Sequence, residues 1–318
     1  MTVDDRNQLL LSPVHLRRDL VARGWTDEML ADAVRQGVLS RPRRGAYVDG
    51  PTWHALDELG RHELTARAAV AQAGRAVVVS HASALVSHGA PRWGLPLDAV
   101  HLTSRDGIGG RVESGIRRHR GTLLEGDVVD VRGLAVTSPS RALLELATTC
   151  STEVALVHVN DLLHRGLTTI SALRDRYEGA MERWPRSRAT DLVLRLADHR
   201  CESVAESRFF FLCWRCGLPA PEPQYKVYDS RGRLVAILDF AWPKLGVFAE
   251  IDGKGKYLEL RRKDESIEDA VLREKGRENL VRRLTGMRGL RFDWADLERP
   301  QATARVVREE LFPEGVSA

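Results

Sequence analysis

The stretch that most constrains the fold is residues 234–257, LVAILDFAWPKLGVFAEIDGKGKY. Two apolar runs, 234–241 and 245–251, flank a turn near Pro243 and Lys244, which predicts two strands joined as a hairpin. Because strand side chains alternate between the two faces of a sheet, the hairpin assigns each of its charged residues to a face. It therefore decides which acidic side chains can lie together.

Three acidic residues of this hairpin are expected to share one face. With the turn centred at Pro243 and Lys244, Asp239 lies opposite Phe248. Its side chain then points to the same side as those of Glu250 and Asp252, whereas a slip of one residue would send it to the other face. The alternative is that Asp239 and Asp252 end the strands and Glu250 is an edge residue. An unpaired charge inside the run VFAEI would be costly, which favours the shared face.

A face with three carboxylates can hold a divalent cation. Hard carboxylate oxygens, with water and a phosphate completing an octahedron, suit Mg2+ (or Mn2+) better than a transition metal. Hydrolysis of a phosphodiester fits this arrangement, because the metal activates water and neutralises charge on the scissile phosphate. A lysine cation would assist, and Lys254 and Lys256 follow directly in the sequence.

The segment from about residue 202 to residue 312 resembles the PD-(D/E)XK nuclease superfamily, and more narrowly its very-short-patch-repair-endonuclease-like branch. The likeness rests on SVAESRFFFL, LDFAWP, EIDGKGKY and REKGRENLVRRLTG followed by LRFDW. The resemblance implies a restriction-endonuclease-like α/β domain with a metal held by acids on adjacent strands. It also makes the helix-borne Glu206 a further acid near the metal; the alternative is a surface acid on an amphipathic helix.

The superfamily usually has a lysine two residues after the glutamate, and this chain has Asp252 there. The cation would then have to come from another lysine of the segment. The candidate catalytic residues are Asp239, Glu250, Asp252, Glu206 and one of Lys256, Lys254 and Lys275, and the candidate metal ligands are Asp239, Glu250, Asp252 and Glu206.

The first fifty residues predict two helices followed by a small hairpin, the order of a winged helix. Ser12 and Pro13 have the residue types of an N-cap and a first helical position, and Thr26 is the expected cap of a second helix that stops at Gly37. The stretch VLSRPRRGAYVDG then turns tightly at its RRG triplet, where Gly45 permits the turn.

Basic residues at this predicted wing suit contacts with DNA phosphates or the minor groove. They are Arg41, Arg43 and Arg44, with Arg35 just upstream. The second helix is acidic at Asp27, Glu28 and Asp32, and acidic side chains can read cytosine but repel phosphate where this helix would enter the major groove. The alternative is a solvated turn on a module that contacts other proteins.

The wing sequence RPRRGAYV is similar to the N-terminal domain of AbiEi-type antitoxins, the DNA-binding partner in type IV toxin-antitoxin systems. The resemblance is strongest over about fifty residues and looser over the next hundred. It implies autoregulation of an operon through binding to promoter repeats, and a nucleotidyltransferase-like toxin as partner.

Residues 51–150 predict a mixed α/β region, and residues 151–200 predict a helical, Arg-rich connector. The middle region carries a second basic cluster, which either contacts DNA or is an exposed strand and turn. Its members are Arg105, Arg111, Arg117, Arg118, His119 and Arg120, of which Arg117, Arg118 and Arg120 are our candidates for DNA contacts.

The histidines and cysteines show no strong metal motif. His81, His88, His101 and His119 lack ligand spacing, and we interpret them as capping or surface residues. A single CxxC, at residues 213–216, lies in the apolar segment FFFLCWRCG, which favours buried small hydrophobes over a zinc site.

Composition bounds the remaining possibilities. A chain of 318 residues with 43% hydrophobic content predicts two or three folded domains. No apolar run approaches the ~18 residues that a membrane span requires, and MTVDDRNQLL lacks the apolar core of a secretory signal, so we expect a cytoplasmic protein without a membrane partner. A net charge of +4 is mild, so nucleic-acid binding rests on local clusters.

Together these features predict an α/β protein that binds double-stranded DNA. Its expected parts are a winged helix (1–50), an AbiEi-like α/β region (51–150), a helical connector (151–200) and a nuclease-like domain (201–318). The preferred function is metal-dependent cleavage or nicking of DNA in defence or mobile-element control. The alternatives are a non-enzymatic repressor or antitoxin with a degenerate nuclease fold, and a toxin-binding protein for which DNA is incidental.

Overall fold

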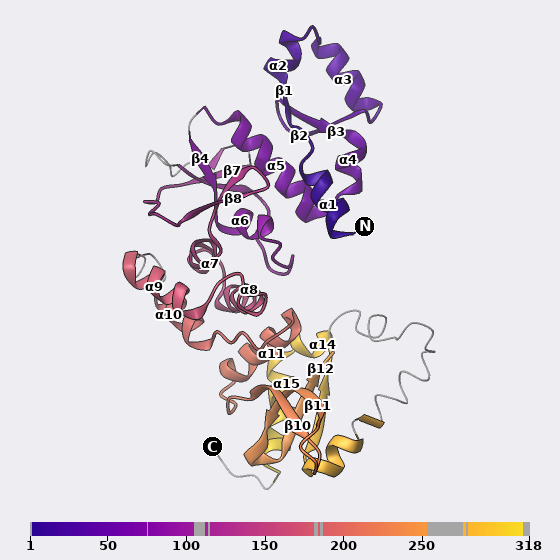
Figure 1. Cartoon of the computed structure of the whole chain (residues 1–318), viewed down its shortest axis with the longest axis vertical. Helices are drawn as coiled ribbons and strands as arrows, with labels where there is room; N and C mark the ends of the chain where they lie inside the picture. Colours follow the sequence, from indigo (N-terminus) through magenta and orange to yellow (C-terminus); the bar gives the residue numbers. More distant parts are fainter. Residues whose placement is uncertain are drawn as a thin grey trace. The chain divides into compact units, whose positions relative to one another are not determined.

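The computed structural model describes residues 2–74, 76–104, 112–113, 115–180, 184, 187–252, 276–277 and 279–313. The chain forms two compact units, which are drawn in one view in Figure 1. The first comprises Met1–His158 and Leu167–Leu194, and the second comprises Val159–Gly166 and Arg195–Ala318. Among the described residues, no helix combines the length and apolar character needed to cross a membrane.

The first unit begins with the helix, strand, helix, helix and hairpin order of a winged helix (Figure 1, indigo). Its three strands form a sheet of order β1-β3-β2. Leu20, Leu30 and Tyr47 pack together beneath the two central helices, and Leu10 and Val48 belong to a second small core. The elements are α1 (Val3–Leu10), β1 (His15–Leu16), α2 (Arg17–Ala22), α3 (Asp27–Arg35), β2 (Leu39–Arg43) and β3 (Ala46–Asp49).

Local signals predicted α3 and the wing correctly, but not the start of α2. The Thr26 hydroxyl caps α3 by accepting from the Met29 amide at 3.2 Å, and Gly37 and Gly45 have φ of +73° and +76°. The predicted helix start at Ser12 is wrong. Residues 15 and 16 instead pair with β3 as strand β1, because extended backbone there gains ladder hydrogen bonds that a helix would forgo.

A six-stranded sheet of order β6-β7-β5-β4-β9-β8 forms the centre of the remaining first unit. The pairs β5–β7 and β4–β9 are parallel, and helices α5 and α6 both contact β5. This is the predicted mixed α/β region. The strands are β4 (Val77–Val79), β5 (Val100–Ser104), β6 (Val112–Glu113), β7 (Ile116–His119), β8 (Val128–Val131) and β9 (Leu134–Thr137). The helices are α4 (Gly50–Ala55), α5 (Glu58–Gln72), α6 (His81–Ser87) and α7 (Pro139–Ala147).

Residues 151–200 form helices, as predicted, and these helices are divided between the two units. They are α8 (Thr152–His164), α9 (Ile170–Ala180) and α10 (Ser187–Leu196). Gly166 separates the first two with a φ of +67°, a left-handed conformation that glycine adopts without strain. Tyr177 of α9 is buried and donates its hydroxyl to the Ser187 carbonyl at 3.2 Å, which ties α9 to α10.

The second unit is a four-stranded sheet of order β10-β11-β12-β13 with helices on both faces (Figure 1). Phe209 of α11 stacks between Phe240 and Phe292 on one face, and Val281 and Phe248 pack together on the other. The strands are β10 (Glu222–Tyr228), β11 (Leu234–Trp242), β12 (Val247–Ile251) and β13 (Arg288–Phe292). The helices are α11 (Val204–Arg215), α14 (Trp294–Leu297) and α15 (Pro300–Leu311), and residues 279–285 are also helical.

The β11–β12 hairpin forms as predicted, but its register is shifted by two residues. Phe248 pairs with Ala241, so the expectation that it lies opposite Asp239 is wrong. The connection is a short 3-10 turn, Pro243–Leu245, followed by Gly246 with φ of +62°, and this longer turn moves the centre of the hairpin. Continuing the ladder by one residue sets Asp239 beside Glu250, so these two acids still occupy neighbouring positions on adjacent strands.

The interpretation of the CxxC cysteines as small buried hydrophobes holds for Cys213, whereas Cys216 is only partly buried. Cys213 is fully buried in the core that contains Phe209 and Phe240. Burial also raises the pKa of the Cys213 thiol far above its ordinary value, so the thiolate that binds a metal is disfavoured. Cys201 is likewise buried and its pKa is raised for the same reason.

Candidate functional site

The wing tip is anchored to the end of α5. The Gln72 side-chain amide donates to the Arg44 carbonyl at 2.9 Å, and α5 contacts β2. Arg41 and Arg44 are exposed, and within the described ranges neither takes part in an ion pair. The turn is therefore held in one place while its two outer guanidinium groups face solvent.

Arg43 of the wing and Arg118 of β7 interact electrostatically, so the two predicted basic clusters influence each other within the first unit. Burial, followed by the charge of Arg118, lowers the pKa of Arg43. Nε of Arg43 and Nη1 of Arg118 are buried without a hydrogen-bond partner in the described part of the chain. Both half-buried cations therefore keep donor capacity that an anion could use.

The acidic residues of α3 are partly neutralised by neighbouring arginines. Arg17 holds Asp27 through two hydrogen bonds of 2.6 and 2.7 Å, and Arg35 pairs with Asp32 within the helix. Both pairs are exposed, where such pairs contribute little stability and exchange readily with solvent. Arg35 thus lies at the end of α3, where its guanidinium is paired with the Asp32 carboxylate.

The remaining basic candidates lie on or beside β7. Arg117 pairs loosely with Asp98 at 3.8 Å, and Arg120 is exposed directly after the strand. Arg105 and Arg111 lie outside the described residues. Side chains alternate along a strand, so Arg117 and Arg118 point to opposite faces of the sheet, with His119 on the face of Arg117, and Arg120 follows the end of the strand.

Each carboxylate of the β11–β12 hairpin has a partner. Oδ2 of Asp239 accepts from the Ile251 amide at 2.7 Å, across the point where the ladder ends. Glu250 is 8% exposed and accepts from Nη2 of Arg277 at 3.0 Å. Asp252 lies 3.4 Å from Nε of Arg291 on β13. A cation at this hairpin would have to compete with these bonds.

Glu206 is buried, which makes the surface alternative wrong. It is 3% exposed, and its carboxylate accepts from the Ser203 hydroxyl at 2.8 Å and from the Glu202 amide at 3.0 Å. Gln224 of β10 donates to the same carboxylate at 3.2 Å. Glu206 therefore closes the first turn of α11 and connects that turn to the sheet.

The candidate acids of the second unit lie within the described residues, but the candidate lysines do not. Lys254, Lys256 and Lys275 lie outside the described residues. Within the described ranges, the acids do not form a group of three with closely spaced ligand atoms; the three histidines of the first unit do. That Asp239, Glu250, Asp252 and Glu206 are ligands of Mg2+ stays a prediction.

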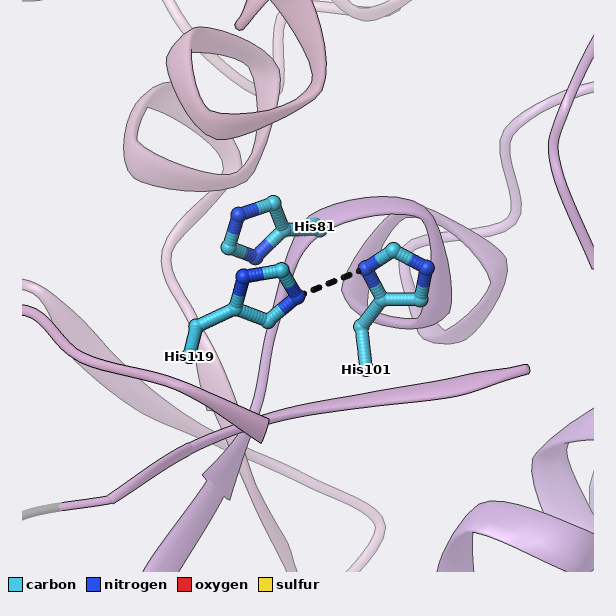
Figure 2. Close-up of side chains that lie close together, drawn as sticks. All are labelled: His81, His101 and His119. Atoms are coloured by element: carbon cyan, nitrogen blue, oxygen red, sulfur yellow. Dashed lines mark hydrogen bonds between the residues drawn. The ribbon is translucent and has the colours of Figure 1, made fainter. Parts of the chain in front are cut away.

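Three histidines predicted as capping or surface residues lie together in the first unit (Figure 2). His101 Nδ1 is 3.0 Å from His119 Nε2, and the His81 ring stacks on the His119 ring with centroids 3.6 Å apart. His81 and His101 are buried and His119 is half-buried. The interpretation as scattered surface residues is therefore wrong for these three. His88, directly after α6, donates from Nε2 to the Thr137 carbonyl at 2.8 Å.

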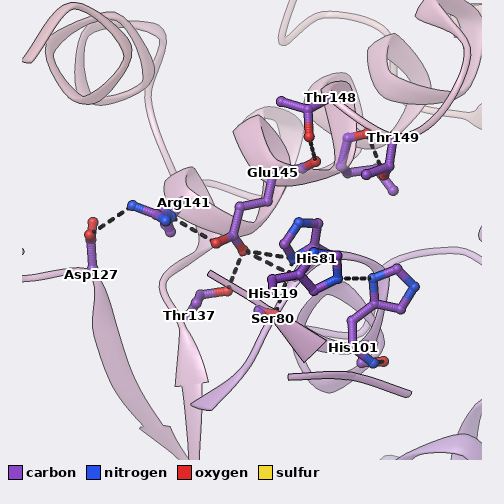
Figure 3. Close-up of polar contacts among 12 residues, drawn as sticks. Ser80, His81, His101, His119, Asp127, Thr137, Arg141, Glu145, Thr148 and Thr149 are labelled. Atoms are coloured by element: carbon purple, nitrogen blue, oxygen red, sulfur yellow. Dashed lines mark hydrogen bonds and ion pairs between the residues drawn. The ribbon is translucent and has the colours of Figure 1, made fainter. Parts of the chain in front are cut away.

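A buried charge network adjoins the histidines (Figure 3). Arg141 of α7 is 1% exposed and donates to Glu145 at 2.8 Å and to Asp127 at 3.1 Å. Burial alone would raise the pKa of Asp127, but bonds from Arg176 and the Leu124 amide and the charge of Arg141 hold it below its ordinary value. The network ties α7 and α9 to the edge of the sheet.

Comparisons with known proteins bear mainly on the N-terminal segment. Residues 16–48, which span β1 to β3 of the winged helix, match a family model described as transcriptional regulator, AbiEi antitoxin. Over 180 residues the chain is 28% identical to two uncharacterized proteins of Mycobacterium tuberculosis, Rv2248 (strain H37Rv) and MT2308 (strain CDC 1551). The aligned region covers 54% of this chain and 63% of each relative.

Among solved structures, the crystal structure of the RV2827C protein from Mycobacterium tuberculosis is similar with a TM-score of 0.40 and 18% identity. The alignment covers 60% of this chain and 75% of that chain. A likeness at this level carries no argument about function. The short family match therefore connects the helix–helix–wing segment, and not the whole chain, with AbiEi antitoxin regulators.

Proposed function

We propose that this protein is a DNA-binding transcription regulator of the AbiEi antitoxin type. The observation that carries the proposal is the winged helix at residues 16–48, which combines the family match with an anchored, arginine-bearing wing. The exposed Arg41 and Arg44 suit phosphate contacts, and the half-buried Arg43 and Arg118 keep donor capacity that an anion could use.

The geometry supports a division of labour between the wing and α3. Phosphate contacts from the wing would set position without reading sequence. Glu28 and Met29 are exposed on α3 and Gln36 is exposed at its C-cap; these residues can accept from cytosine, contact a thymine methyl group or bond adenine, respectively. Release of Arg17 and Arg35 from their carboxylates on approach of DNA would add two further cations.

The test is a salt titration of binding to double-stranded DNA that carries the chain's own promoter. The variant Arg41→Ala/Arg44→Ala should weaken binding to every sequence and lower the slope of log K against log salt by about 0.9 for each phosphate that the wing no longer neutralises. Arg305→Ala, an exposed arginine on α15 of the second unit, is the matched control. A wing variant whose slope equals that of the control would rule the wing out as the phosphate clamp.

The antitoxin part of the proposal includes a protein partner. The resemblance supports a nucleotidyltransferase-like toxin, and co-purification after co-expression with such a toxin encoded next to this chain tests it. DNA binding without toxin binding would reduce the proposal to a repressor.

A second candidate function, metal-dependent cleavage of DNA, is favoured by one observation. Asp239 and Glu250 lie beside each other on β11 and β12 where the ladder ends, as the nuclease resemblance implies. Mg2+ or Mn2+ would be held by Asp239, Glu250 and Asp252, with Glu206 as a further acid, and would supply activation of water and charge neutralisation. Glu250 would have to exchange the Arg277 guanidinium for the ion.

The nuclease candidate is tested by incubating the chain with Mg2+ or Mn2+ and supercoiled, linear and single-stranded DNA. Cleavage that Glu250→Gln abolishes would support it, and Lys256→Met should then reduce cleavage by a factor of order 100 while leaving DNA affinity intact. The same substitution at Lys254 and Lys275 decides which lysine acts. If no cut depends on Glu250, the regulator is the function that remains.

A further inference from the structure

The three clustered histidines of the first unit have the donor set of a metal site. We propose that His81, His101 and His119 bind one divalent transition-metal ion, such as Zn2+. This site is separate from the acidic hairpin of the second unit and from the wing, and it does not depend on the proposed function.

The fold itself brings the three side chains together. In the parallel pair β5–β7, His101 lies opposite Arg117 and His119 lies opposite Thr103, so the two histidines are offset by two residues and share a face. His81 begins α6 directly after β4, which is the other neighbour of β5. Three neighbouring elements thus deliver one imidazole each to the same space (Figure 2).

The distances are close to those that a tetrahedral ion requires. Ligand atoms of the three residues all lie within 4.8 Å of one another, and His101 Nδ1 is 3.0 Å from His119 Nε2. Zinc–nitrogen bonds of about 2.0–2.1 Å place two ligand nitrogens roughly 3.3–3.4 Å apart. His101 and His119 are already close to this spacing, whereas the stacked His81 ring would have to rotate for its ligand nitrogen to reach the same ion.

Two buried polar atoms beside the cluster have no partner among the described residues. They are the Thr103 hydroxyl, on the face that His101 and His119 share, and Nε2 of His101, on the opposite side of its ring from Nδ1. Buried polar atoms are normally paired, so the unpaired hydroxyl beside the two histidines supports a further polar partner at this face.

His81 is oriented by groups that commonly support a metal-bound histidine. Its Nδ1 lies 3.0 Å from the Ser80 hydroxyl and 3.5 Å from Oε2 of Glu145, so an ion would take Nε2, which requires the ring to rotate out of its stack on His119. The same carboxylate accepts from the His81 amide at 3.0 Å (Figure 3). A carboxylate behind the ligand fixes the ring and strengthens its basicity. His81 also holds a φ of +53°, a costly backbone conformation for a non-glycine residue.

The ligand types select the class of metal. Imidazole nitrogens suit Zn2+, Ni2+, Cu2+ and Co2+, whereas Mg2+ and Ca2+ prefer oxygen ligands. Two of the three histidines are almost fully buried, at 5% and 1% exposed, and three protein ligands would leave the fourth position of a tetrahedral ion to water or another small ligand. An ion here would join β5, β7 and the start of α6, and β7 is the strand that carries Arg118.

The test is metal binding by the full chain after removal of metal with a chelator. Co2+ should bind with one equivalent and give the intense visible absorption of a tetrahedral site, and Zn2+ should displace it. Loss of a residue that only supports a metal ligand typically weakens metal binding by roughly 10- to 100-fold. Because His101 and His119 are proposed as ligands themselves, His101→Gln and His119→Gln should each weaken Co2+ binding by more than this. His158→Gln is the matched control, because His158 is a fully buried histidine of the same unit outside the cluster.

Two further measurements distinguish this site from metal binding elsewhere in the chain. Cys213→Ser/Cys216→Ser should bind Co2+ as the parent does; loss of binding in this variant would place the metal at the cysteines and overturn the proposal. Side-chain 15N spectra of the unaltered protein should show that Zn2+ shifts three histidines, and they do not depend on any variant folding. Absence of Co2+ and Zn2+ binding at micromolar concentrations, or shifts confined to histidines outside the cluster, would also overturn it.

Discussion

Replacing Arg141 with methionine should destabilise the first unit by about 3 kcal/mol, the lower end of the range for breaking a buried ion pair from one side. Arg141 is 1% exposed, and its guanidinium lies 4.6 Å from the centre of the Trp184 ring. Methionine keeps most of the aliphatic volume and removes the charge. The lower end is expected because Asp127 keeps Arg176, with bonds of 2.6 and 2.7 Å, whereas Glu145 loses the charged partner at 2.8 Å but keeps the His81 amide and the Thr137 hydroxyl.

The double variant Arg141→Met/Glu145→Gln should recover part of this loss, because the cost arises chiefly from leaving a buried carboxylate uncompensated. The coupling between the two positions is then measured by a double-mutant cycle. The two substituted residues lie one turn apart on α7, so a direct interaction is expected to dominate the cycle.

The assay must report on the first unit alone, since a chain with two compact units need not unfold in one step. Hydrogen exchange in urea, followed on peptides from β4, β9 and α7, gives that local free energy. Arg92→Met is the matched control: Arg92 forms two bonds of 2.6 and 2.9 Å to Glu58, but both side chains are exposed. Equal losses in the two variants, each below about 1 kcal/mol, would refute the argument from burial.

Three further predictions concern single residues. Burial lowers the pKa of His158 to about 4. Between pH 6.5 and 4 the unfolded chain therefore binds a proton at this residue that the folded chain does not bind. The free energy of unfolding should fall by up to about 3 kcal/mol as the pH is lowered through this window. His158→Gln can still donate to the Trp93 carbonyl. It should reduce the slope of the free energy of unfolding against pH by the equivalent of up to one proton, and an unchanged slope would contradict this. Gly289→Ala should destabilise the second unit by about 1–3 kcal/mol in urea unfolding, because the new methyl would lie 2.9 Å from Cε1 of Phe248 and closer to Cζ. Gly276→Ala, where no described atom lies within 4 Å of the added methyl, should be neutral or stabilising; a similar loss in both variants would count against a steric cause.

The sequence predicted those features that depend on neighbouring residues. Thr26, Gly37 and Gly45 indicated the second helix and the wing because caps and left-handed turns are decided within a few residues. The same holds for the hairpin of the second unit, where apolar runs bounded a proline turn. Local chemistry thus determined the helix–helix–wing segment and the presence of adjacent acidic strands.

Features that depend on distant pairing could not be predicted in this way. The register of Asp239 was misplaced by two residues because the turn used Gly246 as well as Pro243, and a ladder's position depends on the full turn conformation. Residues 15 and 16 became a strand because β3 lay beside them, although their own sequence suited a helix start.

The candidate sites show the same division. His81, His101 and His119 have no ligand spacing along the chain, and only the parallel pairing of β5 with β7 next to β4 brings them within reach of one ion. Arg43 and Arg118, from two basic clusters far apart in sequence and on two different sheets, interact electrostatically only in the folded unit. The sequence by itself determined which residue types were available, whereas the tertiary structure decided which of them met, because strand order and register bring side chains together independently of their separation along the chain.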